Sequence, residues 1–450
     1  MRTQKPHSLE SPFCQNRLDE LPGAVVPVPR APAIPSPCGA RLNGSTLSPG
    51  KSHSAVEPLL PQGTPRPLRI VLLGLSITSS WGNGHATTYR GLMRELCARG
   101  HDVMFLERDT KRYAANRDLP RPSYGRVALY SSLAQLKERF QTAVRDADLV
   151  MVGSYVPEGA ALGQWVTRVA QGATAFYDID TPVTLAQLAH GELDYLTHDL
   201  IPRYDIYFSF TGGPVLDTLE QQYGSPMARP LYCAVDPNLY FPEPRATRWD
   251  LGYMGTYSED RQPALDELML EPARNWSRGR FAVAGPQYPK SICWPRNVKR
   301  YTHLPPSRHR AFYNAQRFTL NITRAAMVEA GYSPSVRLFE AAACGTPIIT
   351  DFWEGLDTFF EPHREILVAH SFEESLYYLL ETGDIERELI GKRARARVLA
   401  HHTARHRALE LESCVLDVLA SAGKYDGFGP VGLKPRLEAS EPAGRTRATT

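Results

Sequence analysis

Apolar runs of strand length alternate with helix-length segments along most of this chain. Residues 68–75 (LRIVLLGL) form a nearly continuous apolar run, and similar runs recur at residues 103–107, 147–153, 174–180 and 205–210. Continuous apolar runs are typical of parallel strands that are covered on both faces. The alternation therefore predicts an α/β architecture built from right-handed βαβ units.

The alternation is interrupted at residues 236–244, where three prolines occur in nine residues. Such a segment favours a linker between domains. A second series of strand-like runs follows, at residues 250–255, 280–285, 317–322, 348–351 and 366–369. Because 450 residues exceed one ordinary core, we expect two doubly wound, Rossmann-like domains, 68–236 and 237–423, facing each other across a cleft. The second is expected to carry a helical tail.

The two ends of the chain have a different composition from the middle. Residues 1–67 hold 13 of the 37 prolines, and residues 424–450 are rich in Gly, Pro, Arg and Glu without periodicity. Proline-dense segments cannot sustain a helix or a central strand. We therefore predict a disordered arm over 1–67 and a disordered tail over 424–450.

Composition excludes several classes of function. A formal net charge of +3 is small for this length and does not favour nucleic acid or a polybasic membrane anchor as a partner. The seven cysteines are scattered, and no C-x-x-C pair occurs, so neither a zinc site nor a disulfide framework is predicted. A reducing, cytoplasmic compartment is the plain interpretation. We expect no secretory signal and no transmembrane segment.

The segment 333–351 carries the strongest chemical signal. Ser333 is predicted as the N-cap of a short helix, with Pro334 at its first position and Gly345 as a left-handed residue at its end. Arg337 and Glu340 then lie one turn apart on one face. A carboxylate accepts hydrogen bonds from paired ribose hydroxyls, and a guanidinium beside a helix N-terminus suits phosphate. This combination is what a nucleotide-sugar site needs.

Further candidates for donor binding follow other predicted strands. Gly255 and Thr256 can bring the backbone close to a diphosphate, and Arg261 can supply charge-assisted hydrogen bonds. Ser333 and Ser335 lie at the start of the predicted helix, where an anion is favoured, and Arg324 lies on the segment that leads to it. The alternatives are an ordinary strand-to-helix loop with a solvated arginine, and a helix whose cap is purely structural.

The loop after the first predicted strand is the candidate on the acceptor side. Gly82 and Gly84 permit positive φ, and with Asn83 they can direct backbone N–H groups at an acceptor or a phosphate near a helix start. His85 is a candidate general base. The alternatives are an ordinary glycine-containing turn and a histidine that caps or packs.

Two aspartates end the predicted strand 174–180. Asp178 and Asp180 share a face while the strand lasts, and Asp180 lies nearer its exit. Asp180 is the preferred catalytic or acceptor-binding carboxylate; the alternative is a cap for the following helix. No further ligand cluster lies nearby in sequence, so no metal is predicted. Glu354 and Asp357 either meet the sugar or are loop carboxylates.

Three segments together carry a family resemblance. They are residues 281–286 (FAVAGP), 318–324 (FTLNITR) and 331–347 (GYSPSVRLFEAAACGTP). The chain resembles glycosyltransferases of the GT-B fold, specifically the CgeB-like group, whose C-terminal domain is similar to glycosyl transferases group 1. The resemblance covers about residues 68 to 419.

The resemblance implies a role for two positions of the donor helix. In the wider family two glutamates eight positions apart grip the donor, and the second, which binds the ribose, matches Glu340. The first would contact the donor sugar and is tied to retaining chemistry, but it falls at Tyr332 in this chain. The resemblance therefore leaves the stereochemical outcome open.

We expect a glycosyltransferase of the hexosyltransferase type. The nucleotide sugar is its substrate, no cofactor is required, and the acceptor is a glycan, a lipid, a protein or a small molecule. The second domain should hold the donor, the first the acceptor, and the cleft should close on binding. The alternatives are a GT-B-like sugar-nucleotide epimerase, which would use Asp180 and Glu354, and a non-catalytic protein that binds a nucleotide sugar or a partner.

Overall fold

The computed structural model describes residues 66–81, 83–191 and 193–424. The predicted disordered segments therefore lie outside the described residues, except for their innermost positions 66, 67 and 424. Gly82, one of the predicted site residues, also lies outside them.

Seven parallel strands form the first sheet, in the order β3-β2-β1-β4-β5-β6-β7. They are β1 (Arg69–Gly74), β2 (Asp102–Arg108), β3 (Arg126–Tyr130), β4 (Leu149–Gly153), β5 (Ala173–Asp178), β6 (Ile206–Ser209) and β7 (Ala228–Pro230). β1 lies in the middle of the sheet and is almost wholly buried, as its continuous apolar sequence requires. We call the part of the chain built on this sheet the first lobe.

Helices cover both faces of the first sheet. They are α1 (His85–Ala98), α2 (Lys111–Ala114), α3 (Leu133–Arg145), α4 (Gly159–Val169), α5 (Thr181–His190) and α6 (Pro214–Gln221), with a 3-10 turn at Ile201–Arg203. Leu92 of α1 belongs to the core on one face, whereas Leu136 of α3 and Val166 of α4 belong to the core on the other. The first lobe is thus a doubly wound domain.

The second lobe is built on six parallel strands in the order β10-β9-β8-β11-β12-β13. They are β8 (Trp249–Met254), β9 (Phe281–Ala284), β10 (Val298–Tyr301), β11 (Gln316–Asn321), β12 (Ile348–Thr350) and β13 (Leu367–Val368). Its helices are α7 (Gln262–Leu265), which continues through a π-helical segment (Asp266–Leu270) into α8 (Glu271–Asn275), and α9 (Pro306–Tyr313), α10 (Ala325–Ala330), α11 (Val336–Ala343), α12 (Phe372–Glu381) and α13 (Asp384–His401). Short 3-10 turns occur at Glu259–Arg261 and Leu356–Thr358.

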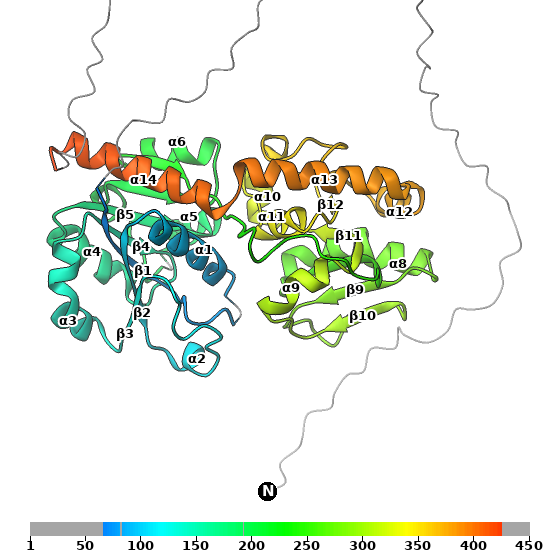
Figure 1. The fold of residues 1–450 in the computed structure, drawn as a ribbon, viewed down its shortest axis with the longest axis horizontal. Coiled ribbons are helices and arrows are strands. Elements are labelled where there is room, and N and C mark those ends of the chain that lie inside the picture. Colours follow the sequence, from blue (N-terminus) through cyan, green and yellow to red (C-terminus); the bar gives the residue numbers. More distant parts are fainter. Residues whose placement is uncertain (1–65, 82, 192, 425–450) are drawn as a thin grey trace, which may run out of the picture. The chain divides into compact units, whose positions relative to one another are not determined.

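The last helix, α14 (Ala404–Ser421), returns to the first lobe (Figure 1). We expected the whole helical tail as part of the second domain. Ile390 and Ala394 of α13 do belong to second-lobe cores, but Leu411 and Val415 of α14 are buried with α1 in the first. The return buries an apolar stripe that would otherwise face solvent.

Two chain segments that connect the lobes run side by side. The Val235 amide donates to the carbonyl of His402 at 3.1 Å, and the Ala404 amide donates to the carbonyl of Val235 at 2.9 Å. Val235 precedes the second sheet, and His402 lies between α13 and α14. Both connections therefore cross from lobe to lobe at one place.

The predicted pair of doubly wound domains is confirmed, and the differences concern element ends and short elements. β5 ends at Asp178, so Asp180 follows the strand rather than ending it. The helix predicted from Pro334 begins at Val336. Gly345 has a φ of +72°, which confirms its left-handed conformation. Within the described residues, no helix has the length and apolar character that crossing a membrane would require.

Candidate active site

Two adjoining cavities lie between the lobes, at the carboxyl ends of the strands. Cavity A has a volume of about 240 Å³ and cavity B about 180 Å³, and Gly84 and Val336 border both. Cavity A is lined by Ser80, Asn83, Thr87, Met254, Gly255, Thr256, Ala284, Gly285, Pro286, His303, Leu304, Pro306, His309, Tyr313, Arg337 and Glu340. Cavity B is lined by His85, Thr88, Ile179, Asp180, Phe210, Thr211, Cys233, Arg261, Ile322, Thr323, Arg324, Met327, Ser333, Pro334 and Ser335. The position at strand ends is where open α/β sheets bind ligands.

Glu340 borders cavity A from the middle of α11. The residue is only 4% exposed, and its Oε2 accepts a hydrogen bond from the Tyr313 hydroxyl at 3.0 Å. His309 Nδ1 lies 3.9 Å from the same oxygen. The carboxylate is therefore held in one orientation at the wall of a cavity, which suits a hydrogen-bond acceptor for a bound hydroxyl.

Arg337 lines cavity A, but most of its N–H groups donate hydrogen bonds to other residues of the protein. Its Nε donates to the carbonyl of Met254 at 2.5 Å, and one amino group donates to Asn321 Oδ1 at 2.6 Å. Met254 ends β8 and Asn321 ends β11, so the guanidinium braces two neighbouring strand ends beneath the cavity. The predicted contact between Arg337 and a diphosphate stays a prediction, and it would have to use the second amino group.

The start of α11 differs from the prediction. Ser335 occupies the N-cap position, but its side chain accepts no capping hydrogen bond from the helix, and its hydroxyl donates to Asn321 Oδ1 at 2.7 Å. The Ser333 hydroxyl shares a hydrogen bond of 2.6 Å with Thr211 of the first lobe. The prediction of Ser333 as N-cap is therefore wrong, because a partner from the other lobe takes its side chain. Ser333 and Ser335 both line cavity B, and the first-turn N–H groups of α11 follow directly.

Two glycines let the loops after β8 and β9 meet at cavity A. A side chain at Gly285 would place its Cβ 1.8 Å from the carbonyl oxygen of Gly255, so only glycine fits there. The Gly255 amide donates to the carbonyl of Ala284 at 2.9 Å. Arg261 donates through an amino group to the Thr256 carbonyl at 2.7 Å, while its Nε is buried without a hydrogen-bond partner among the described residues.

Asp180, His85 and Arg324 converge on cavity B from three elements. Asp180 Oδ2 lies 3.9 Å from His85 Nε2 and 4.0 Å from an amino nitrogen of Arg324. Asp180 occupies the N-cap position of α5, but its side chain makes no capping hydrogen bond. The oxygen instead accepts from the Tyr155 hydroxyl at 3.1 Å. The alternative that the Asp180 side chain only caps α5 is therefore wrong, because the side chain bonds to Tyr155 and not to the helix.

The charge state of Asp180 follows from these neighbours. Burial acts to raise the pKa of its carboxyl, but the nearby His85 and Arg324 side chains, at 3.9 and 4.0 Å, and the hydrogen bond from the Tyr155 hydroxyl outweigh burial and lower it. Asp180 is thus ionised at neutral pH. A carboxylate that is ionised beside a cavity can accept a hydrogen bond, or a proton, from a bound hydroxyl.

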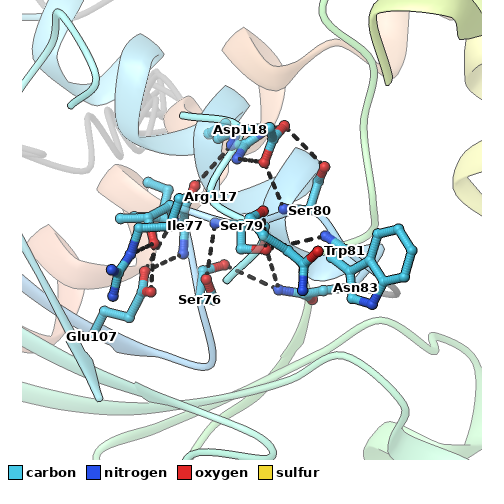
Figure 2. Close-up of polar contacts among 12 residues, drawn as sticks. Ser76, Ile77, Ser79, Ser80, Trp81, Asn83, Glu107, Arg117 and Asp118 are labelled. Atoms are coloured by element: carbon cyan, nitrogen blue, oxygen red, sulfur yellow. Dashed lines mark hydrogen bonds and ion pairs between the residues drawn. The ribbon is translucent and has the colours of Figure 1, made fainter. Parts of the chain in front are cut away.

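The loop after β1 is held by two carboxylates (Figure 2). Glu107 accepts hydrogen bonds from the backbone amides of Ile77 and Thr78 at 2.8 and 3.0 Å. Asp118 accepts from the amide and the hydroxyl of Ser80 at 2.8 and 2.9 Å. The loop is therefore rigidly attached to its own lobe where it borders cavity A.

Asn83 and Gly84 have different roles in this loop. The Asn83 side chain donates to the carbonyls of Ser76 and Ser79 and accepts from the His85 amide at 3.1 Å, which sets the start of α1. Gly84 has a φ of −63°, and a methyl group there would meet nothing within 4 Å. The prediction that Gly84 supplies positive φ is therefore wrong, because ordinary helical backbone suffices.

Sequence reasoning missed several residues of the site. His303, His309 and Tyr313 line cavity A, and Trp81 contacts His303 across the lobes, with ring centroids 4.8 Å apart. Figure 2 shows the Trp81 indole projecting from the loop, and 42% of the residue is exposed. Tyr155 lies two positions after the predicted strand 147–153, so the strand-end rule applied to the other candidates would have included it.

Tyr332 occupies the position at which the resembling family has its first glutamate. It has a φ of +47° and lines neither cavity. Its ring lies against Gly213 of the first lobe and Gly355 of the second, since a methyl group on either glycine would lie 2.3 Å from the ring. Its carbonyl also accepts from the Gly212 amide at 3.0 Å. The side chain packs between the lobes instead of reaching the ligand space.

Comparison with known proteins agrees with the two-lobed fold described above. Residues 261–413 match a family model described as "Glycosyl transferase-like". A search of curated protein sequences found no match. Among solved structures, sucrose-phosphate synthase from Thermosynechococcus elongatus has a TM-score of 0.59 at 14% identity, over 78% of this chain and 100% of that chain. The fold is that of the GT-B glycosyltransferases.

Two further GT-B structures were solved with a nucleotide bound. HepE of Anabaena in complex with UDP-glucose has a TM-score of 0.58 at 12% identity, over 79% of this chain and 100% of that chain. An α-glucosyltransferase in complex with UDP and a DNA containing an HMU base also has a TM-score of 0.58 at 12% identity, over 78% of this chain and 100% of that chain. At these identities the likeness establishes the GT-B fold.

Proposed function

We propose that this chain is a CgeB-like glycosyltransferase that moves a hexose from a nucleotide-sugar donor to an acceptor hydroxyl in the cytoplasm. One observation carries the proposal. A buried carboxylate (Glu340) and the start of its helix border a cavity that adjoins a second cavity with an ionised carboxylate (Asp180) from the other lobe. Donor and acceptor groups thus have separate, neighbouring places, as a transfer reaction requires.

The nucleoside part of the donor belongs in cavity A. Glu340 accepts hydrogen bonds from the ribose hydroxyls, and the close-packed loops at Gly255–Thr256 and Gly285 leave backbone next to the ligand. The diphosphate then lies at the start of α11, where Ser335, Arg261 and Arg324 border cavity B. Helix N–H groups and guanidinium groups stabilise negative charge there. UDP-sugars are the first donors to test, because HepE was solved with UDP-glucose.

The acceptor hydroxyl belongs in cavity B, beside Asp180 and His85. Its oxygen forms a bond to the anomeric carbon of the donor sugar, and the bond from that carbon to the diphosphate oxygen breaks. The hydroxyl proton passes to Asp180, which His85 orients at 3.9 Å. The electron pair of the broken bond leaves on the diphosphate, whose growing charge Arg261, Arg324 and the N–H groups of α11 stabilise. This mechanism needs no metal ion or cofactor.

The structure gives no support to the epimerase alternative. An epimerase would pair Asp180 with a second acid or base in the same space, and Glu354 was the candidate. Glu354 lines neither cavity, and the residue is exposed.

Calorimetric titration with UDP, GDP, ADP, CDP and TDP tests the donor site. One diphosphate should bind, and Glu340→Gln should weaken it about 10- to 100-fold, since a hydrogen bond to a charged group contributes roughly 1.5–3 kcal/mol. Glu381→Gln, an exposed glutamate at the end of α12, is the matched control and should leave affinity unchanged. Equal affinity of Glu340→Gln and wild type would remove the donor-site assignment.

Transfer itself is tested by incubating the protein with the sugar nucleotide of that diphosphate and a panel of glycan, lipid, protein and small-molecule acceptors. Formation of a glycosylated acceptor together with the nucleoside diphosphate supports the proposal. Binding of the sugar nucleotide without product on any acceptor would identify a binding protein instead, and conversion of the sugar without an acceptor would identify an epimerase.

A further inference from the structure

We propose that Tyr155 is a positioning residue that holds the Asp180 carboxylate in place for proton transfer. This inference rests on the proposed function, in which Asp180 receives the proton of the acceptor hydroxyl. Neither the sequence motifs nor the fold comparison assigns a role to Tyr155.

The backbone at Tyr155 is held in an unfavourable conformation. Its φ is +63°, in the left-handed region that a tyrosine rarely adopts. Such residues persist where the surrounding structure determines them, and they cluster at functional sites. The neighbouring Ser154 supplies the constraint: its amide donates to the Tyr177 carbonyl at 2.9 Å, and its hydroxyl oxygen accepts from the Ile179 amide at 3.1 Å.

These bonds tie the residues after β4 to the residues after β5. The left-handed turn then directs the Tyr155 hydroxyl to Asp180 Oδ2, at 3.1 Å. The Tyr155 ring packs against Tyr195 and His85, with centroid distances of 5.0 and 5.5 Å.

Tyr155 acts through Asp180 and not on the substrate. It does not belong to the lining of cavity B, whereas Asp180 and His85 do. Burial and the neighbouring Asp180 raise the pKa of the Tyr155 hydroxyl far above its usual range. The hydroxyl therefore stays protonated and is a permanent hydrogen-bond donor, so it cannot itself take the proton.

The charged groups around Asp180 define what the hydroxyl contributes. His85 from α1 and Arg324 from the second lobe face its Oδ2 from one side, and Tyr155 from the loop after β4 completes the set. Asp178, fully buried behind, adds a like charge when ionised. Without the Tyr155 hydroxyl, the ionised form of Asp180 loses a donor and its orientation is set by the two longer contacts alone.

Tyr155→Phe tests the inference because it keeps the ring and removes the hydroxyl. We expect kcat for transfer to fall about tenfold, with KM for the sugar nucleotide unchanged, because the donor site is untouched. The acid limb of the pH–rate profile should move to higher pH by about one unit, because protonation of Asp180 becomes easier. Tyr204→Phe is the matched control, since the buried Tyr204 hydroxyl has no hydrogen-bond partner among the described residues; it should leave kcat and the profile as in wild type.

A second measurement does not depend on catalysis. Carbon-13 NMR of the side-chain carboxyls, with Asp180→Asn to assign the signal, follows the titration of Asp180 in wild type and in Tyr155→Phe. A higher midpoint in the variant supports the inference, and identical midpoints overturn it. A wild-type protein that transfers no sugar, together with a shifted midpoint, would count against the proposed function and leave the positioning role standing.

Discussion

At the scale of single residues, two aspartates two positions apart have opposite environments. Asp178 ends β5 and is fully buried, and burial raises its pKa to about 6 even though the hydroxyls of Tyr207 and Thr184 donate to it. Asp180 borders cavity B, and His85, Arg324 and Tyr155 lower its pKa despite burial. The chain thus places a structural carboxylate and the proposed base two positions apart in the same segment.

Asp180→Asn should lower kcat for transfer by about 10²–10⁴-fold, the usual contribution of a positioned acid or base. The dissociation constant for the nucleoside diphosphate should not rise, because Glu340 and cavity A are intact and the substitution removes no positive charge from around the diphosphate. Steady-state kinetics and calorimetric titration check the two parts. Asp217→Asn, an exposed position on α6, is the control. Wild-type kcat in Asp180→Asn would exclude this carboxylate as the base.

The direction of the Asp180 shift also predicts the pH dependence of transfer. The base form is present above its pKa and is lost as the pH falls through it, and the pKa lies below the usual aspartate range. In wild type, kcat should therefore hold as the pH falls to the usual aspartate range and decline only below it, as long as the protein stays folded. Kinetics over a pH series, with far-UV circular dichroism at each pH, check this. An acid limb near neutrality would point to a group other than Asp180.

At the scale of elements, the segment that leads into α11 is attached to both lobes. Ser333 shares a hydrogen bond with Thr211, the thiol of Cys233 donates to the Pro334 carbonyl at 3.1 Å, and Tyr332 packs between two glycines. The helix that carries Glu340 is therefore positioned by contacts from the first lobe as well as by its own sheet.

Gly355→Ala should destabilise the protein by about 2–4 kcal/mol. The substitution adds a methyl group 2.3 Å from the Tyr332 ring at a φ of +83°, so overpacking and left-handed strain add together. Urea-induced unfolding measures the free energy. Gly383→Ala is the control: its φ is −65°, and a methyl group there meets nothing within 4 Å. A loss below about 1 kcal/mol in Gly355→Ala would mean that the Tyr332 ring can move aside.

The sequence predicted the long buried elements well, because their signal is local. The run at residues 68–75 appears as β1 and the run at 317–322 as β11, each as a strand of a parallel sheet. Shorter or less apolar elements were not predicted, since their strand or helix character comes from neighbours in space: α2, β3, α3, β7, α8, β10 and α10.

The sequence predicted which loops border the site, but it did not predict which side chains contact one another there. Glu340 and Asp180 do border adjoining cavities. The partners that set their geometry come from residues distant in sequence: Tyr313 for Glu340, 27 positions away, and Tyr155 for Asp180, 25 positions away. The misassigned cap at Ser333 has the same origin, because its partner Thr211 is 122 positions away.

At the scale of the described molecule, α14, the last helix of the described residues, completes the first lobe. Leu411 and Val415 of α14 are fully buried against the core that includes Leu92 and Leu96 of α1. The first lobe, which begins with β1, thus includes a helix that follows the second lobe in sequence. Loss of packing in α14 should therefore lower the local stability of α1, which begins with His85.

Leu411→Ala should lower the free energy of unfolding by about 2–5 kcal/mol, the usual cost of removing a buried leucine side chain. Urea-induced unfolding measures the loss, and hydrogen exchange should show faster exchange in α1. Ile385→Ala is the control, because Ile385 on α13 is 80% exposed; it should change the free energy by less than about 0.5 kcal/mol. Unaltered stability in Leu411→Ala would mean that α14 is not part of the first-lobe core.

The Tyr332 ring has a thermodynamic consequence for the two substrates. It touches the first lobe through Gly213, and four residues later the same backbone enters α11. A ligand that shifts α11 should therefore also change the position of the first lobe, which carries Asp180. Occupancy of one cavity should change the affinity of the other, and linkage requires the reverse effect to have the same size. Nucleotide titrations at several acceptor concentrations would give this coupling as a single factor.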